Sequence, residues 1–349
     1  MEIKDNIIGI LIPTFNRISF LEESLKSATE QSFKNIEIIV IDNGSTDRTA
    51  EFMNGISDPR VRYIVNESNI GMIGSINKGI NLFSDKVVWC TILGDDDLLD
   101  KDFIMKLLYA ATDSAAKSIV HSHRIFIDEQ GNKIREATLS PQEETAFDYM
   151  KMRAYAKRET YLTGVLFNRK AFKEMKGYPS FATGLASDDA FIFALALKDR
   201  LVFDQSAVAY IRIHEGAESL SCSDGMRKLE TVKQFGEYCE RVARENGNYS
   251  QNKLRTFELT FSKYIRGLYS YWWIQTAHCT FDQGNKKEVP LQELLDLVKI
   301  NWNNFSFRVK LAVLCHKITG IFPEASNGYR TCWEYIINVS QLLKKRFLL

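Results

Sequence analysis

The sequence predicts an α/β protein in which a largely parallel sheet is covered by helices on both faces and is followed by a mainly helical region. Over residues 1–100, short apolar runs alternate with segments of helical apolar spacing. The runs are apolar without interruption, which is typical of strands buried on both faces. From about residue 225 onward, aromatic and basic residues accompany apolar residues at helical spacing, which predicts helices.

Apolar runs and turn residues define the elements of the first hundred residues. Strands are expected at 7–12, 36–43, 61–65 and 87–93, and helices at 20–31, 45–53 and 71–83. The first helix is justified by Leu21, Leu25 and Ala28, which fall on one helical face.

The pattern is looser after residue 100. A helix is expected at 103–111, a strand at 118–128 with a turn at 131–132, a helix at 187–198 and a strand at 201–214. Residues 141–160 are polar, and we expect an irregular segment there.

Charge divides the chain into two parts. The 349 residues carry a net charge of +1, which gives no support to a general nucleic-acid-binding role. Residues 1–224 hold 26 Lys and Arg against 33 Asp and Glu, whereas residues 225–349 hold 19 against 11. This asymmetry predicts one domain over 1–224, with halves that meet near residue 100, and a basic helical region over 225–349.

The cysteines and the apolar runs indicate a cytoplasmic protein. The six cysteines are scattered and form no C-x-x-C pair, so a disulfide framework or a zinc site is not expected. The apolar run at Ile7–Ile12 is too short for a signal peptide or a membrane span.

Three carboxylates, Asp95, Asp96 and Asp97, stand directly after the apolar run that ends at Gly94. Neighbouring carboxylates repel one another unless a positive charge lies among them. A divalent cation would remove that cost, because hard cations take oxygen ligands. A solvated acidic turn that caps a helix explains the same residues, and both interpretations stay open on this segment alone.

The polar segments at the strand ends are predicted to meet. PTFNR (13–17), DNGSTD (42–47) and GDDD (94–97) each follow a predicted strand. In an open α/β sheet, ligands bind in the crevice at the carboxyl ends of the strands. We therefore expect the three segments to line one crevice.

Six segments in order carry a family pattern: IPTFNR, VIDNGSTDRT, NESNIGMIGSINKG, ILGDDDLLD, ASDDAFIFALAL and YIRIH. Together they resemble the family 2 glycosyltransferases of GT-A fold, over roughly residues 5–220. The resemblance implies a Rossmann-like mixed sheet and a single-sugar, inverting transfer from a nucleotide-sugar to a hydroxyl of a glycan. It also implies a role in bacterial surface polysaccharide synthesis, such as O-antigen, capsule or lipooligosaccharide.

The resemblance assigns the site residues. A divalent cation, Mn²⁺ or Mg²⁺, is expected on Asp95, Asp97 and His214. The nucleotide is expected on Pro13, Thr14, Asn16, Arg17, Asp42, Asn43, Gly71, Asn77, Asp95 and Asp96. For Asp42 the residues also allow an Asx turn. The chain departs from the family at Gly94, where many members have the first Asp, and at Ile76, where many have Arg.

A second acidic pair, Asp188–Asp189, opens the apolar helix predicted at 187–198. The bland interpretation is a helix cap. The resemblance instead implies that Asp189 is the general base, which takes the proton of the acceptor hydroxyl, and that Asp188 supports it.

The C-terminal segments 305–318 and 331–349 combine helical apolar spacing with Lys and Arg. They predict either helices packed on the catalytic domain or a peripheral contact with the inner face of the plasma membrane. The Q-x-x-R-W motif of processive synthases is absent. A nucleotidyl- or phosphotransferase and a non-catalytic sugar-nucleotide-binding module remain as alternative functions, although no P-loop motif occurs.

Overall fold

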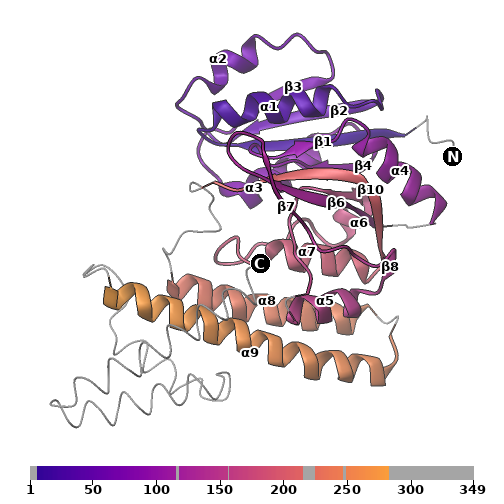
Figure 1. The fold of residues 1–349 in the computed structure, drawn as a ribbon, viewed down its shortest axis with the longest axis vertical. Helices are drawn as coiled ribbons and strands as arrows, with labels where there is room; N and C mark the ends of the chain where they lie inside the picture. The colour runs from indigo at the N-terminus through magenta and orange to yellow at the C-terminus, as the bar shows by residue number, and fades with distance from the viewer. Residues whose placement is uncertain (1–5, 115–117, 156, 215–224, 247–248, 283–349) are drawn as a thin grey trace. The chain divides into compact units, whose positions relative to one another are not determined.

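The computed structural model describes residues 6–114, 118–155, 157–214, 225–246 and 249–282 (Figure 1). The chain divides into two compact units. The first comprises residues 1–149, 158–180 and 187–217, and the second comprises 150–157, 181–186 and 218–349.

A ten-stranded mixed sheet forms the centre of the first unit, as far as the structure describes it. Eight strands follow the order β3-β2-β1-β4-β9-β6-β10-β5, and in addition β7 pairs with β6 and β8 pairs with β10. The strands are β1 Ile7–Thr14, β2 Ile36–Asp42, β3 Val61–Val65, β4 Val87–Ile92, β5 Leu98–Leu99, β6 Ile119–Ile127, β7 Lys133–Glu136, β8 Glu143–Glu144, β9 Val165–Asn168 and β10 Leu201–Arg212. β1 to β4 pair in parallel, whereas β9 lies antiparallel between β4 and β6.

The helices up to residue 196 are α1 Ile18–Thr29, α2 Thr49–Asn54, α3 Gly71–Leu82, α4 Phe103–Asp113, α5 Ala146–Ala154, α6 Arg169–Glu174 and α7 Ser187–Ala196 (Figure 1). Of these, α1, α3, α4, α6 and α7 pack on strands of the sheet. Ile10 and Ile12 of β1 lie in one buried cluster with residues of α1 and α4. Leu11 faces α3, which approaches so closely that a Cβ at Gly79 would lie 2.3 Å from Leu11 Cδ1. Both faces of β1 are therefore buried, which explains its uninterrupted apolar run.

The α/β prediction is confirmed, and the mixed sheet agrees with the GT-A expectation. One expected element is wrong: α5 lies inside the segment 141–160 that we expected to be irregular. Ala146, Tyr149 and Met150 are buried at helical spacing, but this stripe of three residues is too short to stand out among polar neighbours.

In the second unit, α8 (Gly225–Glu245) and α9 (Gln251–Asp282) pack on each other. Phe235 of α8 meets Phe261 of α9 with ring centroids 5.6 Å apart. Across the described residues, no helix has the length and the apolar character that crossing a membrane requires. The segments predicted at 305–318 and 331–349 lie outside the described residues.

Candidate active site

The segments after β1 and β2 form one edge of the site. Thr14 and Asp42 are partners in the parallel register, and the Asn43 N–H donates to the Thr14 carbonyl at 2.9 Å. Asn16 has a positive φ of 53°. This conformation lets its N–H donate to Ser45 Oγ at 2.8 Å while its Oδ1 accepts from the Thr46 N–H at 2.7 Å. The predicted meeting of these two strand ends is therefore present in the structure.

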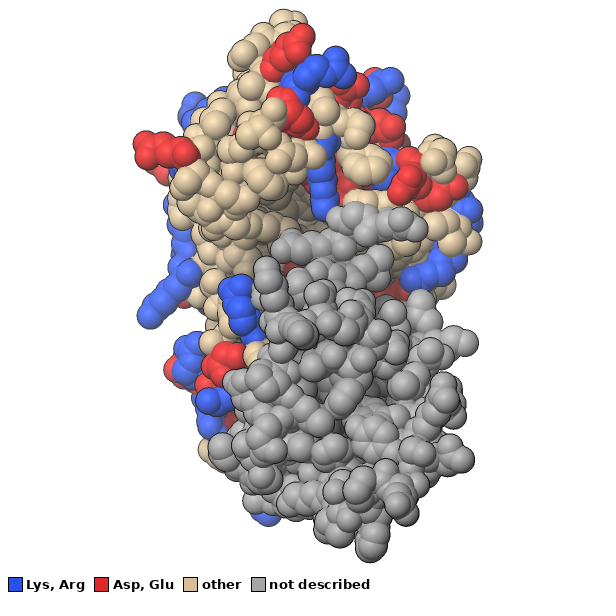
Figure 2. Space-filling model, turned by 90° about the vertical axis from the view of Figure 1, so that its left-hand side faces the viewer, with Lys and Arg blue, Asp and Glu red and all other residues tan. Residues whose placement is uncertain are grey.

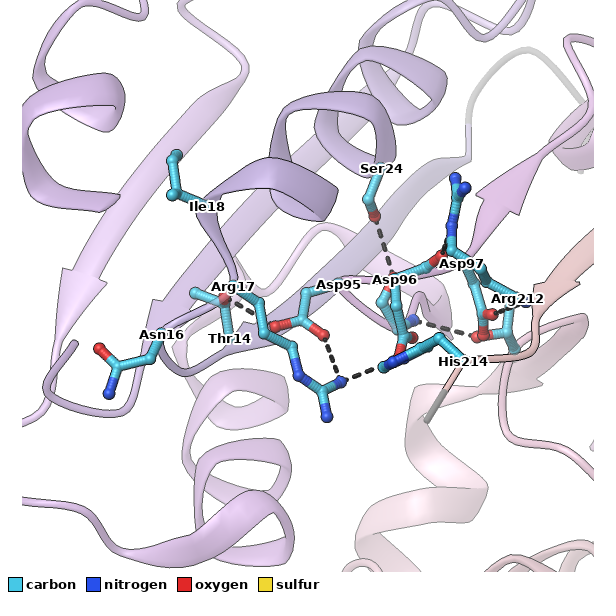
Figure 3. A network of polar contacts seen from close by, with 12 residues as sticks. Thr14, Asn16, Arg17, Ile18, Ser24, Asp95, Asp96, Asp97, Arg212 and His214 are labelled. Carbon is cyan, nitrogen blue, oxygen red and sulfur yellow. Dashed lines mark hydrogen bonds and ion pairs between the residues drawn. The ribbon is translucent and has the colours of Figure 1, made fainter. Parts of the chain in front are cut away.

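The acidic cluster after β4 lies beside them (Figure 3). The Thr14 hydroxyl donates to Asp95 Oδ2 at 2.8 Å. Arg17 Nη1 lies 3.3 Å from Asp95 Oδ1 and 2.8 Å from Asp96 Oδ2. His214 Nε2 lies 3.0 Å from the same Asp96 oxygen. Asp96 Oδ2 is thus shared by a guanidinium and an imidazole.

Burial and the neighbouring charge make two of the carboxylates weaker acids than usual. Burial, and then the charge of Asp96, raise the pKa of Asp95 to about 6. The same two causes, in the same order, raise the pKa of Asp97 to about 7. A positive charge placed beside these two groups would favour their ionised form.

Arg212 holds the cluster's backbone in place. Its N–H donates to Asp97 Oδ1 at 2.9 Å, and its Nε donates to the Asp96 carbonyl at 2.8 Å. Its buried guanidinium also contacts the Glu129 carbonyl and Glu23 Oε2 at 2.6 and 2.7 Å. Arg212 therefore acts here as a buried support for the backbone of the cluster.

The three acids of the cluster have different partners. The resemblance assigns the cation to Asp95, Asp97 and His214, but His214 contacts Asp96 rather than Asp97. Asp97 Oδ1 accepts from the Arg212 N–H. The cation assignment to Asp95, Asp97 and His214 stays a prediction.

Asp42 and Asn43, which are expected to contact the nucleotide, are held by hydrogen bonds within the protein. Asp42 is buried; its Oδ1 accepts from the Ser45 N–H at 2.7 Å and its Oδ2 from the Tyr63 hydroxyl at 2.6 Å. Asp42 thus closes the turn at 42–45, and its contact with the nucleotide stays a prediction. Asn43 Oδ1 accepts from the Ile70 N–H at 2.9 Å, which fixes the loop before Gly71. Pro13 lies in β1, one residue before the strand ends.

Asn77 is used differently from the expectation. Its Nδ2 donates to the Tyr178 carbonyl at 3.2 Å, and its Oδ1 accepts from the Tyr178 N–H at 2.7 Å. The predicted nucleotide contact of Asn77 is not supported by this geometry, because both polar atoms hold the Tyr178 backbone. The neighbouring Lys78 donates to Asn66 Oδ1 at 2.7 Å.

Three hydroxyl groups donate hydrogen bonds to the second acidic pair. The Tyr178 hydroxyl donates to Asp188 Oδ1 at 2.5 Å. Asp189 is buried, and its Oδ1 accepts from the Tyr149 and Thr160 hydroxyls at 3.0 and 2.9 Å. Sequence reasoning missed these three donors, since they lie in separate segments and belong to none of the recognised motifs.

The segment 160–163 joins the two acidic centres. Thr160 contacts Asp189, while Thr163 Oγ1 accepts from the Gly94 N–H at 3.0 Å and hydrogen-bonds to Asp97. Three residues of extended chain span at most about 10 Å. The two acidic centres are therefore connected through one short segment.

A complete metal cage is not preformed. Within the described ranges, no three His, Cys, Asp or Glu side chains are gathered closely enough to hold a metal ion. Asp96 Oδ2 and His214 Nε2 converge at 3.0 Å, and Asp95 lies on the other side of Arg17 Nη1. These groups fit a cation that completes its coordination with substrate oxygens, as Mg²⁺ and Mn²⁺ commonly do.

Residues 9–176 match the family described as glycosyl transferase family 2. An uncharacterized glycosyltransferase of Haemophilus influenzae is 27% identical over 212 residues, which cover 59% of this chain and 79% of that protein. The GalNAc(5)-diNAcBac-PP-undecaprenol beta-1,3-glucosyltransferase of Campylobacter jejuni is 33% identical over 132 residues. These cover 37% of this chain and 41% of that protein, which is well under its full length.

Two solved structures share the fold at low sequence identity. TarS of S. aureus, residues 1–349 in complex with UDP-GlcNAc, has a TM-score of 0.60 and 15% identity, and covers 94% of this chain and 90% of that one. The mannosyltransferase PcManGT of Pyrobaculum calidifontis, in complex with GDP-Man and Mn²⁺, has a TM-score of 0.50 and 14% identity, and covers 97% of this chain and 86% of that one. Motifs, fold and relatives agree that residues 9–176 of this chain are a glycosyl transferase family 2 region.

Proposed function

We propose that this chain is an inverting glycosyltransferase that moves one sugar from a nucleotide-sugar to a hydroxyl of a glycan acceptor, with help from Mn²⁺ or Mg²⁺. One observation carries the proposal: segment 160–163 ties an acidic centre with cationic partners to an acidic centre with hydroxyl partners. A transfer of this type needs both, because one centre must stabilise a leaving diphosphate and the other must accept a proton.

The leaving-group side of the reaction is assigned to Asp95, Asp96 and His214. A divalent cation held there would neutralise the charge that develops on the departing diphosphate. Arg212 and Thr163 fix the backbone that presents these groups. The base of the nucleotide is assigned to the pocket at Asp42, where a ring N–H could replace the Tyr63 hydroxyl as donor.

The acceptor side is assigned to Asp189. Its carboxylate takes the proton of the acceptor hydroxyl while that oxygen forms a bond to the anomeric carbon. The bond to the diphosphate breaks with its electron pair, and one displacement inverts the anomeric configuration. Tyr149 and Thr160 hold Asp189 Oδ1 in place. Asn77 fixes Tyr178, whose hydroxyl holds Asp188 beside the base.

A lipid-linked glycan of bacterial surface polysaccharide is the proposed acceptor. The name of the Campylobacter jejuni relative describes an undecaprenol-linked substrate. The net charge of residues 225–349, with 19 basic against 11 acidic residues, favours a reversible contact with an anionic membrane. On the face shown in Figure 2, basic and acidic side chains of the described residues are interspersed, so such a contact is not assigned to that face.

The decisive experiment is an incubation of the purified chain with UDP- and GDP-sugars, Mn²⁺ and an undecaprenyl-diphosphate-linked glycan. We expect release of nucleoside diphosphate that depends on the acceptor, and a product with inverted configuration by NMR. Release of pyrophosphate would favour a nucleotidyltransferase. Binding of the sugar-nucleotide with no product would favour a non-catalytic module. Flotation with anionic vesicles at low and high salt tests the membrane contact, which should weaken as salt screens it.

A further inference from the structure

Arg17 lies beside Asp95 and Asp96 of the acidic cluster (Figure 3). An added cation bound by these carboxylates would lie in the same place. A single atom, Nη1, contacts both Asp95 Oδ1 and Asp96 Oδ2, at 3.3 and 2.8 Å. The Arg17 side chain is 29% exposed, compared with 8% for Asp95 and 19% for Asp96. Arg17 is thus a fixed positive charge with a path to solvent, placed over two carboxylates that have little.

A cation bound by Asp96 and His214 would conflict with this arrangement. Asp96 Oδ2 is the oxygen that His214 Nε2 also contacts, at 3.0 Å. Metal–oxygen distances are about 2.1 Å, so a cation on this oxygen would stand at most about 5 Å from Nη1 of a guanidinium that is always protonated. Two positive charges at such a distance repel strongly in a partly buried site.

We propose that Arg17 is a built-in counter-ion that competes with the divalent cation for Asp95 and Asp96 and leaves them when the cation binds. This inference rests on the proposed function, because it assumes that the cluster takes a metal. The move requires no change in the main chain: the Arg17 carbonyl accepts the first hydrogen bonds of α1 from Phe20 and Leu21. The displaced guanidinium is then available for the donor diphosphate, which it fits as a planar fork of donors.

Direct binding of Mn²⁺ without donor tests the competition, by isothermal titration calorimetry and by electron paramagnetic resonance. Arg17→Gln removes the competing charge, and we expect it to bind Mn²⁺ roughly three- to tenfold more tightly than the wild type, as the loss of two part-exposed ion contacts predicts. Arg17→Lys keeps the charge and should stay near the wild type. The difference between wild type and Arg17→Gln should shrink at high salt.

Arg62→Gln is the matched control. Arg62 lies on the edge strand β3 and pairs with Glu37 of β2, so the substitution removes the same charge from an ion pair outside the cluster. Its Mn²⁺ affinity should equal that of the wild type. A second readout is the binding of UDP and GDP to the Mn²⁺-loaded protein. If Arg17 passes from carboxylate to diphosphate, Arg17→Gln should bind the nucleotide several-fold more weakly despite its tighter hold on Mn²⁺, as the loss of a charge-assisted hydrogen bond predicts.

Equal or weaker Mn²⁺ binding by Arg17→Gln overturns the inference, as does a wild type and a variant that both fail to bind Mn²⁺. Either result leaves the proposed function to the transfer assay, which does not depend on this comparison. Conversely, the wild type could transfer no sugar and still bind Mn²⁺ more weakly than Arg17→Gln. That result would support the role of Arg17 as a counter-ion and contradict the proposed transferase activity.

Discussion

The two acidic centres of this site are built from similar residues but have different partners. Asp95–Asp97 are contacted by Arg17, His214 and the backbone of Arg212. The hydrogen bonds described for Asp188 and Asp189 come from the neutral hydroxyls of Tyr149, Thr160 and Tyr178. The first centre follows the apolar strand β4 and the second opens the apolar helix α7. Because both adjoin an apolar element, sequence composition alone does not distinguish their functions.

The difference in partners teaches how one chain can give two carboxylate groups separate tasks. Carboxylates whose charged partners can be replaced by another cation are suited to hold a positive charge that stabilises a leaving group. Hydroxyl partners orient a carboxylate without neutralising it, which leaves it able to accept a proton. The environment of each centre, rather than its residue types, therefore carries the functional assignment.

The largest effect is expected from Asp189→Asn. Loss of a positioned base costs about 10²–10⁴-fold in rate. The Asn carbonyl can still accept from Tyr149 and Thr160, because both donate to the same oxygen. Donor binding and the melting temperature should stay close to the wild type while single-turnover transfer is nearly lost.

Asp188→Asn is the control for that variant. It should lower stability more than turnover, as expected for a side chain that supports its neighbour. An inactive Asp188→Asn together with an active Asp189→Asn would exchange the two roles within the pair.

The cation-dependent centre is tested with Asp96→Asn. We expect Mn²⁺ affinity to fall at least about tenfold, since even the outer partners of metal ligands are worth that much. Asp97→Asn should keep an affinity close to the wild type, because Asp97 faces the Arg212 backbone. Calorimetry on both variants decides between them, and a larger loss in Asp97→Asn would restore the assignment that the family pattern implies.

Asp42 belongs to neither acidic centre, and its substitution tests how much recognition of the nucleotide base contributes to donor binding. Asp42→Asn should raise the KM for the donor about tenfold, the value of one buried hydrogen bond to a charged group, with little change in kcat. Tyr63→Phe removes the hydroxyl that contacts Asp42 Oδ2 and leaves the carboxylate. Steady-state kinetics on both should separate binding from chemistry, and an equal fall in kcat would contradict a role confined to binding.

The smallest expected effect is a pH dependence of stability in the presence of chelator. The folded pKa values of Asp95 and Asp97, about 6 and about 7, lie above the ordinary 3.8. Between pH 4 and 7 the native state therefore binds more protons than the unfolded state, and the free energy of unfolding should fall as the pH rises. Asp97→Asn should flatten this slope in melting curves, and an unchanged slope would show that Asp97 does not titrate there.

The sequence predicted the parallel half of the sheet well, because each strand from β1 to β4 is an apolar run closed by turn residues. It also predicted that the segments at 13–17, 42–47 and 94–97 meet. It could not predict the segment 160–163, whose two threonines act through hydrogen bonds to residues 29 and 69 positions away. The roles of Arg212 and Asn77 were missed for the same reason, since long-range backbone contacts leave no local pattern.

Gly94 limits the mutational routes open to this chain. A Cβ at this position would lie 2.9 Å from both Asp96 Oδ1 and Asp97 Oδ2. An aspartate at this position would therefore push on the carboxylates that now fill the space. The identity of residue 94 and the positions of Asp96 and Asp97 are thus coupled, and a side chain introduced at 94 should be tolerated better when one of these acids is changed as well.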